Sequence, residues 1–352
     1  MSRWKITLTI FLFVFRGGIS SILHGSHAYA YSEPSSYYFL ANGHFFIIKP
    51  EQQSLSCLGS FHYAAPTIAL SPDGLYWARW GEKTLAAFNP KSGKIEAKVT
   101  LPHRPYNHII ADNGKAYVTH HTLTARGFWI SVADTSQKKL VKIIKDIWGL
   151  RTGLAYGHGF VYLAAIGVGR PDNLYLYQIN SQNDRLKEIY RVPKTDYSWK
   201  ISVLGNSLYL CHLNMPDKSL APMIEIMDLE RKKIIQTLNT SKLKGVKKIL
   251  GKITFYGKRG FFPCLRTDGH YGLALFNPQL GRVEKVFKVI SPIHKIIGLR
   301  DDFLFYIDTP AGAGKKEISL YFYNLNLGKE VKVISTAKFL KGKQKILKDG
   351  KL

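Results

Sequence analysis

The chain has few cysteines, and none of them stands in a metal-binding or haem-binding pattern. Cys57, Cys211 and Cys264 are the three in 352 residues, so they cannot all pair, and none belongs to a C-x-x-C or C-x-x-C-H motif. Metal and covalent haem sites built on cysteine are therefore excluded, and no cofactor is expected. Cys211 and Cys264 each end an expected strand, where a small buried thiol is the simpler interpretation.

Acidic residues and enzyme motifs are also scarce. There are 24 Asp and Glu against 50 Lys and Arg, which is too few carboxylates to propose an acid-base pair. No G-x-S-x-G elbow occurs. The stretch from Ala311 to Lys316 resembles a phosphate loop but lacks its leading glycine and the Ser or Thr after the lysine. The chain is therefore more typical of a non-enzymatic protein than of an enzyme.

Long apolar runs are missing except near the start of the chain. Arg3 and Lys5 precede a ten-residue apolar run, Ile6 to Phe15, and a small-x-small signal follows at Ala28-Tyr29-Ala30. The run is too short to span a bilayer. We expect residues 1–30 to be a cleaved signal peptide and residues 31–352 to form one exported domain without a transmembrane segment, periplasmic or extracellular. An uncleaved anchor or a different start is the alternative.

Positive charge is abundant. The formal net charge is +26, and removal of Arg3, Lys5 and Arg16 leaves 47 basic against 24 acidic residues. Such a field attracts acidic proteins, anionic polymers, nucleic acid or lipid headgroups. Because export disfavours nucleic acid, we expect an anionic protein or polymer as partner. The alternative is a solvated basic surface with no specific partner.

A short phrase recurs seven times along the chain. Phe88-Asn89-Pro90-Lys91-Ser92-Gly93-Lys94 returns at Phe276 to Arg282 and, more loosely, at Tyr323 to Lys329. The polar anchors of all seven copies lie at positions 49, 89, 134, 180, 228, 277 and 324, spaced by 40 to 49 residues. This period, with a strand-turn-strand unit inside it, is typical of a β-propeller blade. The sequence predicts an all-β, seven-bladed β-propeller.

Strands are expected on either side of each anchor. The second unit shows all four: Thr67 to Leu70, Leu75 to Arg79, Thr84 to Asn89 and Lys94 to Leu101. The first unit shows three, at Tyr37 to Ala41, His44 to Lys49 and Ser54 to Leu58. Second strands of the later units are expected to begin at Lys115, Phe160, Ser207, Phe261 and Phe303. No amphipathic helical period interrupts them.

The strand missing from the first unit has a counterpart at the C-terminus. Lys345 to Leu352 matches the strand-turn phrase of Ile68 to Leu75. A propeller leaves no open edge when one terminus completes the blade of the other. We therefore predict that residues 343–349 pair with Tyr37 to Ala41. A frayed lysine-rich tail is the alternative.

Two units carry a family resemblance. Thr67 to Trp77 and Tyr117-Val118-Thr119-His120 resemble the YVTN-type β-propeller repeat, within a superfamily similar to the quinoprotein amine dehydrogenase heavy chains. The sixth unit departs from it, with Phe262-Pro263-Cys264 where the signature would stand. The resemblance implies exported scaffolds that bind other molecules, some of them enzyme subunits, and it implies fold more strongly than activity.

The loops that gather on one face of such a propeller are rich in Arg, His and aromatic residues. Guanidinium groups grip carboxylate or phosphate, and flat rings stack on planar or pyranose faces. The predicted ligand-binding face contains His62, Arg104, Tyr106, His120, His121, Arg126, Trp148, Arg151, Arg170, Tyr197, His212, Arg266, His270 and His294. Paired imidazoles at His120-His121 could bind a metal, but a structural loop pair is the favoured interpretation, and no catalytic or metal residue is assigned.

Two functions follow from these observations. The first is an exported, non-enzymatic binding or scaffold protein whose basic channel mouth engages an anionic protein, cell-wall polymer or glycan. The second is an enzyme or enzyme subunit, either a dehydrogenase heavy chain with a partner subunit or a lactonase- or lyase-type propeller that uses loop His and Asp.

Overall fold

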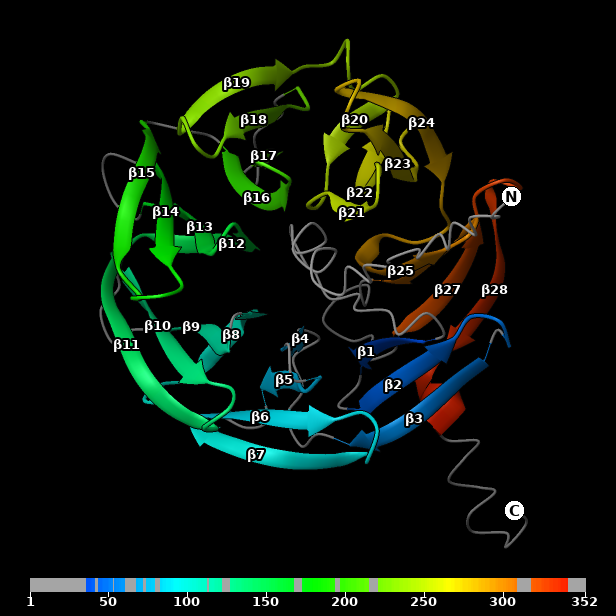
Figure 1. The fold of residues 1–352 in the computed structure, drawn as a ribbon. Helices are drawn as coiled ribbons and strands as arrows, with labels where there is room; N and C mark the ends of the chain where they lie inside the picture. Colours follow the sequence, from blue (N-terminus) through cyan, green and yellow to red (C-terminus); the bar gives the residue numbers. More distant parts are fainter. Residues whose placement is uncertain are drawn as a thin grey trace, which may run out of the picture.

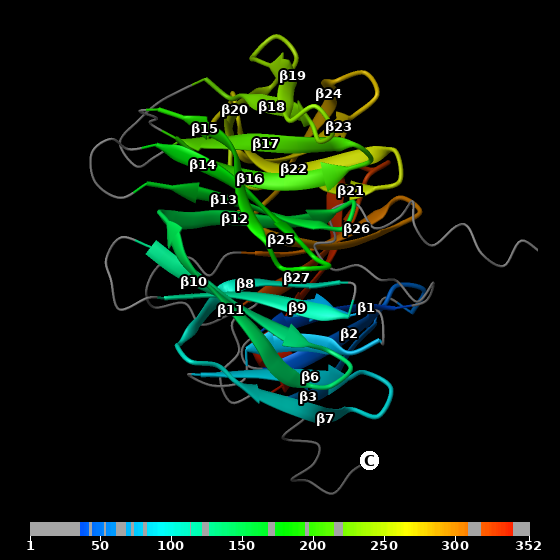
Figure 2. The same cartoon turned by 60° about the vertical axis from the view of Figure 1, so that its left-hand side comes forward.

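Seven antiparallel sheets stand as blades in a ring around a common centre (Figures 1 and 2). The computed structural model describes residues 36–41, 44–52, 54–60, 68–71, 74–79, 83–112, 114–121, 127–167, 173–193, 197–214, 221–308 and 318–340. The expected signal peptide and the predicted closing strand at 343–349 lie outside these residues. No helix in the described ranges is long and apolar enough to cross a membrane.

Successive strands of the first four blades pair in chain order. Blade 1 contains β1 (Tyr37–Ala41), β2 (His44–Lys49) and β3 (Ser54–Ser60). Blade 2 contains β4 (Ile68–Leu70), β5 (Tyr76–Arg79), β6 (Thr84–Asn89) and β7 (Lys94–Thr100). Blade 3 contains β8 (Pro105–Asp112), β9 (Lys115–His121), β10 (Gly127–Asp134) and β11 (Lys139–Trp148). Blade 4 contains β12 (Leu150–Gly157), β13 (Phe160–Ile166), β14 (Leu174–Asn180) and β15 (Leu186–Val192).

The last three blades repeat this arrangement, with one extra strand in blade 6. Blade 5 contains β16 (Tyr197–Leu204), β17 (Ser207–Asn214), β18 (Ile224–Asp228) and β19 (Lys233–Leu238). Blade 6 contains β20 (Val246–Ile249), β21 (Thr254–Tyr256), β22 (Arg259–Arg266), β23 (Tyr271–Asn277) and β24 (Arg282–Lys288). Blade 7 contains β25 (Ile293–Arg300), β26 (Phe303–Asp308), β27 (Ser319–Asn324) and β28 (Lys329–Ser335). The seven-bladed propeller predicted from the repeat is confirmed.

The recurring phrase is the hairpin between the last two strands of a blade. In blade 2 the side-chain oxygen of Asn89 accepts hydrogen bonds from the backbone N–H groups of Lys91 and Ser92, at 2.8 and 3.2 Å. Gly93 then takes a positive φ of 69° and donates its N–H to the Asn89 carbonyl. Five further copies place an Asn or Asp at the same point, namely Asp134, Asn180, Asp228, Asn277 and Asn324. The repeat therefore encodes a turn that is capped by an Asn or Asp side chain, called here the Asx-capped turn. The fifth residue of this turn, counted from the Asn or Asp, adopts a left-handed backbone conformation.

Burial differs between the middle and the outermost strands. In β14 six of seven residues are buried, whereas β7 and β28 are made mainly of exposed and partly exposed residues, with Val99 on β7 buried. The middle strands are packed on both faces by neighbouring blades, so their amino-acid sequences are nearly continuous apolar runs. The outermost strands carry lysines, which protect a sheet edge from pairing with other chains.

A hydrophobic cluster fills each of the seven junctions between neighbouring blades. The junction between blades 7 and 1 includes Tyr37, whose ring packs against Phe305 at 5.4 Å between centroids. The Tyr37 hydroxyl donates to the carbonyl of Leu299 at 2.6 Å. Because the cluster is continuous across this junction, the ring is closed by packing within the described residues.

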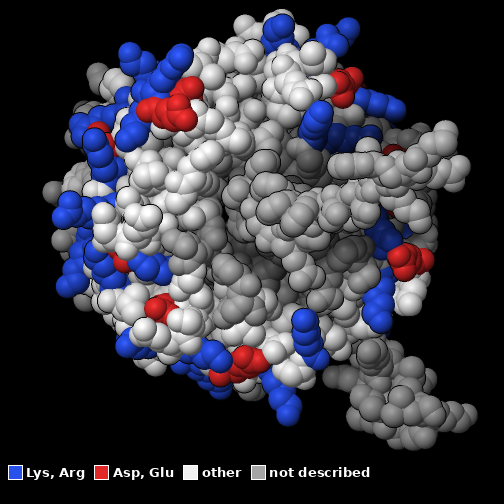
Figure 3. Space-filling view, in the orientation of Figure 1, with Lys and Arg blue, Asp and Glu red and all other residues white. Residues whose placement is uncertain are grey.

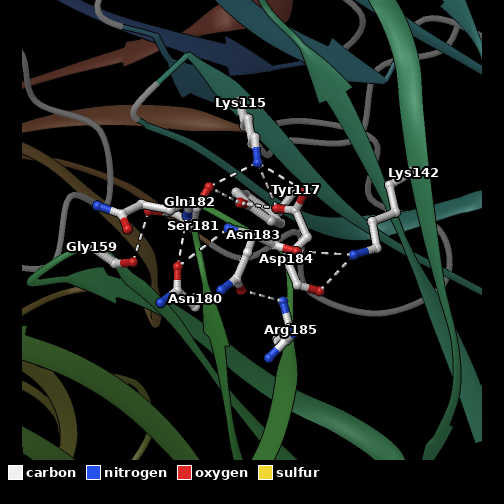
Figure 4. Close-up of polar contacts among 10 residues, drawn as sticks. All are labelled: Lys115, Tyr117, Lys142, Gly159, Asn180, Ser181, Gln182, Asn183, Asp184 and Arg185. Carbon is white, nitrogen blue, oxygen red and sulfur yellow. Dashed lines mark hydrogen bonds and ion pairs between the residues drawn. The ribbon is translucent and has the colours of Figure 1, made fainter.

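Blades 3 and 4 are also joined by a buried polar clamp (Figure 4). The Lys115 ammonium on β9 lies 2.9 Å from both carboxylate oxygens of Asp184, in the turn between β14 and β15, and 2.8 Å from the Ser181 carbonyl. The buried Tyr117 hydroxyl donates to the same carboxylate at 2.8 Å. Side chains of blade 3 thereby stabilise the Asx-capped turn of blade 4.

Candidate functional site

The candidate site is a cluster of basic side chains on the inner elements of blades 5, 6 and 7. Lys200 lies on β16, His294 and Lys295 lie on β25, and Lys252 lies between β20 and β21. These elements lie on the inner side of their blades, toward the centre of the ring (Figure 1). Three consecutive blades therefore carry four basic residues on their inner elements. We call Lys200, Lys252, His294 and Lys295 the channel cluster.

The register of the strands places two of the lysines at equivalent positions. Lys200 pairs with Cys211, the fifth residue of β17, and Lys295 pairs with Ile307, the fifth residue of β26. The corresponding residue of blade 4 is Gly153, which has no side chain to offer. Blade 4 therefore adds no basic side chain at this position to those of blades 5 and 7.

Lys252 belongs to this group because the inner strand of blade 6 is interrupted between β20 and β21. Pro263 on β22 has no N–H to donate to this inner element. The pairing of the inner element with β22 ends at Leu250, whose N–H donates to the Pro263 carbonyl at 2.9 Å. The pairing resumes at Thr254, the first residue of β21. A Cβ at Gly251 would lie 2.7 Å from the ring of Pro263, so the break fits closely. Lys252 occupies the resulting gap.

Burial and neighbouring positive charges lower the pKa values of three members of the cluster. Burial, followed by the charge of Lys252, lowers the pKa of Lys295 to about 7. Burial, followed by the charge of Lys200, lowers the pKa of Lys252 to about 8. Burial, then the charges of Lys295 and Lys200, lowers the pKa of His294, while Asp308 opposes this shift. The coupled pairs are therefore Lys200 with Lys252, Lys252 with Lys295, and His294 with each of Lys295 and Lys200.

Two other ionisable groups, Asp308 and Cys211, lie near the cluster. The Asp308 carboxylate accepts hydrogen bonds from the Ser319 N–H at 2.8 Å and the Tyr321 hydroxyl at 3.0 Å. Burial raises the pKa of the Cys211 thiol to about 12, so it stays neutral. As whole residues the lysines are partly exposed and His294 is exposed, whereas the ammonium nitrogen of Lys295 is itself buried. Chemically, the arrangement is suited to binding negative charge.

Six of the predicted face residues cannot be placed as side chains. His62, Arg126 and Arg170 lie outside the described residues. Tyr106, His121 and Arg151 lie on β8, β9 and β12, and only their backbone is described. The predicted site of these six residues stays a prediction.

Two predicted histidines are buried and have internal partners. His120 is fully buried, with Nε2 2.8 Å from the Ser131 hydroxyl. The Nε2 atom of His212 lies 2.8 Å from Oε2 of Glu225 and 3.2 Å from Nε1 of Trp199. These contacts are those of core histidines, and both residues lie on strands, β9 and β17, rather than in the loops where they were expected.

The remaining predicted residues are spread over several blades. Tyr197 packs on His212, with ring centroids 4.0 Å apart, and Trp148 is exposed at the end of β11. Arg104 is exposed. Arg266 binds Asp268 through Nε and Nη2, and the backbone N–H of His270 donates to the same carboxylate. Of the predicted side chains that are described, His294 belongs to the channel cluster.

Sequence reasoning did not select the three lysines of the cluster. Lys200 and Lys295 stand inside apolar strand segments, Trp199-Lys200-Ile201 and His294-Lys295-Ile296, rather than in loops. A lysine at an inner-strand position is the signal that would have found them. Lys252 could not be placed without knowing that β20 and β21 are separated.

Much of the positive charge lies elsewhere, on the outermost strands. Figure 3 shows Lys and Arg spread around the rim of the propeller. The outermost strands β7, β11, β15, β19, β24 and β28 carry Lys94, Lys98, Lys139, Lys142, Lys145, Lys187, Arg191, Lys233, Arg282, Lys285, Lys288, Lys329 and Lys332. This part of the charge fits the role of protecting sheet edges. It is distinct from the channel cluster, which lies on inner elements.

No metal centre is evident in the part of the chain that is described. Its residues contain no group of three or more His, Cys, Asp or Glu side chains that could hold an ion. Cys211 and Cys264 are buried and free, in accordance with the expected structural role, although β17 and β22 continue past them to Asn214 and Arg266.

Comparison with known proteins supports the fold. No family model and no curated protein matches the chain. Among solved structures, it is similar to the computationally designed Ika8 protein, at 9% identity over 85% of this chain and 87% of that one, with a TM-score of 0.55. It is similar to hydrazine synthase of Kuenenia stuttgartiensis, at 12% identity over 74% and 78%, with a TM-score of 0.51. It is also similar to the dihydro-heme d1 dehydrogenase NirN in complex with DHE, at 12% identity over 86% and 74%, with a TM-score of 0.56. At these identities the likeness shows the fold alone. The chain is a seven-bladed β-propeller.

Proposed function

We propose that this propeller is an exported, non-enzymatic binding protein that engages an anionic protein, cell-wall polymer or glycan at the basic mouth of its channel. The observation that supports the proposal is the channel cluster, in which Lys200, Lys252 and Lys295 come from inner elements of three consecutive blades. Basic side chains gathered on neighbouring inner elements attract negative charge. A negatively charged group of the partner would meet them there. We further propose that the repeat is of the YVTN type, which the sequence resembles.

A binding experiment tests this function with matched charge variants. The purified chain is titrated with polyglutamate, polygalacturonate and polyphosphate at low and high salt. We expect at least one of them to bind, with affinity that falls steeply as salt rises. The variant with Lys200, Lys252 and Lys295 changed to Gln should lose roughly tenfold or more of that affinity, because the fixed charges that meet the anion are gone.

The matched control removes three charges from outermost strands. Lys94, Lys233 and Lys329 are exposed and lie on β7, β19 and β28. Changing these three to Gln should leave the affinity within roughly threefold of the parent, since screened surface charges act weakly at a distance. Equal losses in the two triple variants would mean that binding follows net charge alone, and the proposal would fail.

Export has its own test. If the protein recovered from the cell envelope begins at Tyr31, the expected cleavage after Ala28-Tyr29-Ala30 has occurred. A chain that retains residues 1–30, or one found only in the cytoplasm, would contradict the exported part of the proposal.

The alternative is an enzyme or a subunit of one. Two of the similar solved structures are enzymes by name, a hydrazine synthase and a dehydrogenase. A subunit role predicts a stable complex with a second chain when the protein is purified from its source. Recovery of such a complex with catalytic activity, together with no binding of the anionic polymers, would favour this alternative.

A further inference from the structure

We propose that one face of the propeller docks on an anionic lipid bilayer through a ring of exposed basic side chains and two exposed leucines. This face, called here the turn face, is formed by the turns between the last two strands of the blades. Because neighbouring strands are antiparallel, it lies at the opposite end of the blades from the loops of the predicted ligand-binding face. The inference therefore goes beyond the proposed function and does not depend on the channel cluster.

The Asx-capped turns of blades 2 to 7 carry a basic residue at one fixed position. The sixth residue of each turn, counted from the Asn or Asp, is in chain order Lys94, Lys139, Arg185, Lys233, Arg282 and Lys329. Strand register places it directly across from the capping residue, as Asn89 pairs with Lys94 and Asp228 pairs with Lys233. The six residues therefore form a ring, and Lys and Arg follow the circumference of the propeller in Figure 3.

The charge of this ring is not neutralised by the chain. All six side chains are exposed, and none forms a hydrogen bond or an ion pair with another residue that the structure describes. Acidic side chains near two turns do have partners, since Asp184 binds Lys115. Glu51, in the turn of blade 1, binds Arg300. In the turn of blade 5, Glu230 is outnumbered by three basic neighbours. The turn face therefore attracts negative charge.

The protection of sheet edges does not account for the position of these residues. A charge anywhere along an outermost strand disfavours pairing with another chain. The basic residue instead stands at the start of the strand, or directly before it, in each of blades 2 to 7. A position fixed relative to the turn is expected if one surface meets all the turns together.

Two of the turns also expose a leucine. Leu280 in blade 6 and Leu327 in blade 7 are 52% and 62% exposed. Both stand fourth in their turns, and their backbone N–H groups donate to the side-chain oxygens of Asn277 and Asn324, at 3.1 and 2.9 Å. The cap thus fixes the backbone of each leucine, two residues before the basic residue of the ring.

This combination fits a lipid bilayer better than a soluble polymer. Side chains at equivalent positions about one axis lie close to a plane, so a flat array of headgroups meets all of them at once, whereas an extended polymer crosses only a few. Basic residues near a bilayer are attracted to anionic headgroups. Apolar side chains beside them enter the boundary between headgroups and acyl chains.

Vesicle flotation tests the inference on the full purified chain. Vesicles of phosphatidylcholine alone are compared with vesicles that contain phosphatidylcholine and phosphatidylglycerol in equal amounts. We expect binding to the anionic vesicles to be roughly tenfold or more stronger and to fall as salt rises. Residues 1–30 are present in every variant, so their apolar run contributes equally to all comparisons. Equal binding to the two kinds of vesicle would overturn the inference.

Matched charge variants locate the contact. The turn variant changes three lysines of the ring to Gln, namely Lys94, Lys233 and Lys329. It should bind anionic vesicles roughly tenfold or more weakly, because half of the ring charge is lost. The control variant changes to Gln three exposed lysines near the other ends of the strands, namely Lys83, Lys288 and Lys338. It loses the same net charge and should stay within roughly threefold of the parent. Equal losses in the two variants would overturn the inference.

The leucines have a test of their own. Leu280→Ser with Leu327→Ser should weaken binding to anionic vesicles roughly threefold or more, because less apolar surface enters the bilayer. Ile290→Ser is the control, since Ile290 is exposed and follows β24 at the end away from its turn. Unfolding curves verify that all variants are folded. Unchanged binding in the leucine variant would overturn the bilayer as the partner, since a purely electrostatic contact needs no insertion.

The inference and the proposed function can fail separately. The variant with Lys200, Lys252 and Lys295 changed to Gln should bind vesicles within roughly threefold of the parent. If vesicles bind through the ring but no anionic polymer binds, the inference stands and the proposed function is wrong. If the turn variant loses polyglutamate or polyphosphate to the same extent as vesicles, the turn face binds soluble polyanions, and the bilayer is overturned as its partner.

Discussion

At the scale of single residues, the Asx-capped turn is the feature that repeats. Its fifth position is glycine in some blades and a residue with a side chain in others. Gly93, Gly281 and Gly328 hold this position with positive φ in three blades. In blade 5 it is held by Lys232, with a φ of 54°. A side chain in the left-handed region costs roughly 1 kcal/mol relative to glycine. The turns of different blades therefore differ in local stability although their hydrogen bonds are alike.

We predict that Lys232→Gly raises the free energy of unfolding by about 0.5 to 1 kcal/mol, because it relieves backbone strain at an exposed turn. Gly93→Ala should lower it by a similar amount or more, since alanine must adopt the same strained conformation. Chemical denaturation of both variants measures the two changes. If Lys232→Gly were destabilising, the backbone-strain account of this turn would be wrong.

The sequence revealed these turns better than it revealed the channel cluster. The turn is local, so its polar anchor, its glycine and its spacing are all visible in one short phrase such as Phe88 to Lys94. Lys200, Lys252 and Lys295 are separated by 52 and 43 residues and meet only because successive blades turn about one axis. Their convergence depends on strand register and on the break opposite Pro263, neither of which a single sequence specifies.

At the scale of elements, strand positions were predicted closely and one interruption was missed. The strands expected at Tyr37 to Ala41, His44 to Lys49 and Thr84 to Asn89 coincide with β1, β2 and β6. Alternation and flanking turns define such strands. The break between β20 and β21 arises from Pro263 on the neighbouring strand, a contact between segments that periodicity within one segment cannot report.

The clamp between blades 3 and 4 gives a prediction at this scale. Asp184→Ala should lower the free energy of unfolding by roughly 2 to 3 kcal/mol, because Lys115 and Tyr117 would be left without their shared carboxylate in a mostly buried position. Glu188→Ala is the control, since its ion pair with Arg191 is exposed and should contribute less than about 1 kcal/mol. Denaturation curves of the two variants provide the comparison. Similar losses in both would show that the clamp acts as an ordinary surface pair.

At the scale of the whole molecule, the remaining question is how the ring is completed at blade 1. Blade 1 has three strands within the described residues, whereas its neighbours have four. Packing between blades 7 and 1 is nevertheless continuous, through Tyr37, Phe305 and the ion pair of Arg300 with Glu51. A Cβ at Gly298 would lie 2.4 Å from the Tyr37 ring, so this junction requires glycine. Ring closure therefore has a packing component that is independent of the predicted C-terminal strand.

We predict that the C-terminal strand adds a second component. If residues 343–349 pair with β1, their backbone amides should be protected from hydrogen exchange nearly as well as those of β1, because ladder hydrogen bonds open only with the blade. A chain that ends at residue 340 should unfold at a lower denaturant concentration, since β1 would then expose an inner edge. Gly298→Ala is the comparison, because it disturbs the packing component and leaves the C-terminal strand intact. Unprotected amides at 343–349, together with an unchanged unfolding midpoint in the shortened chain, would mean that packing between blades 7 and 1 closes the ring by itself.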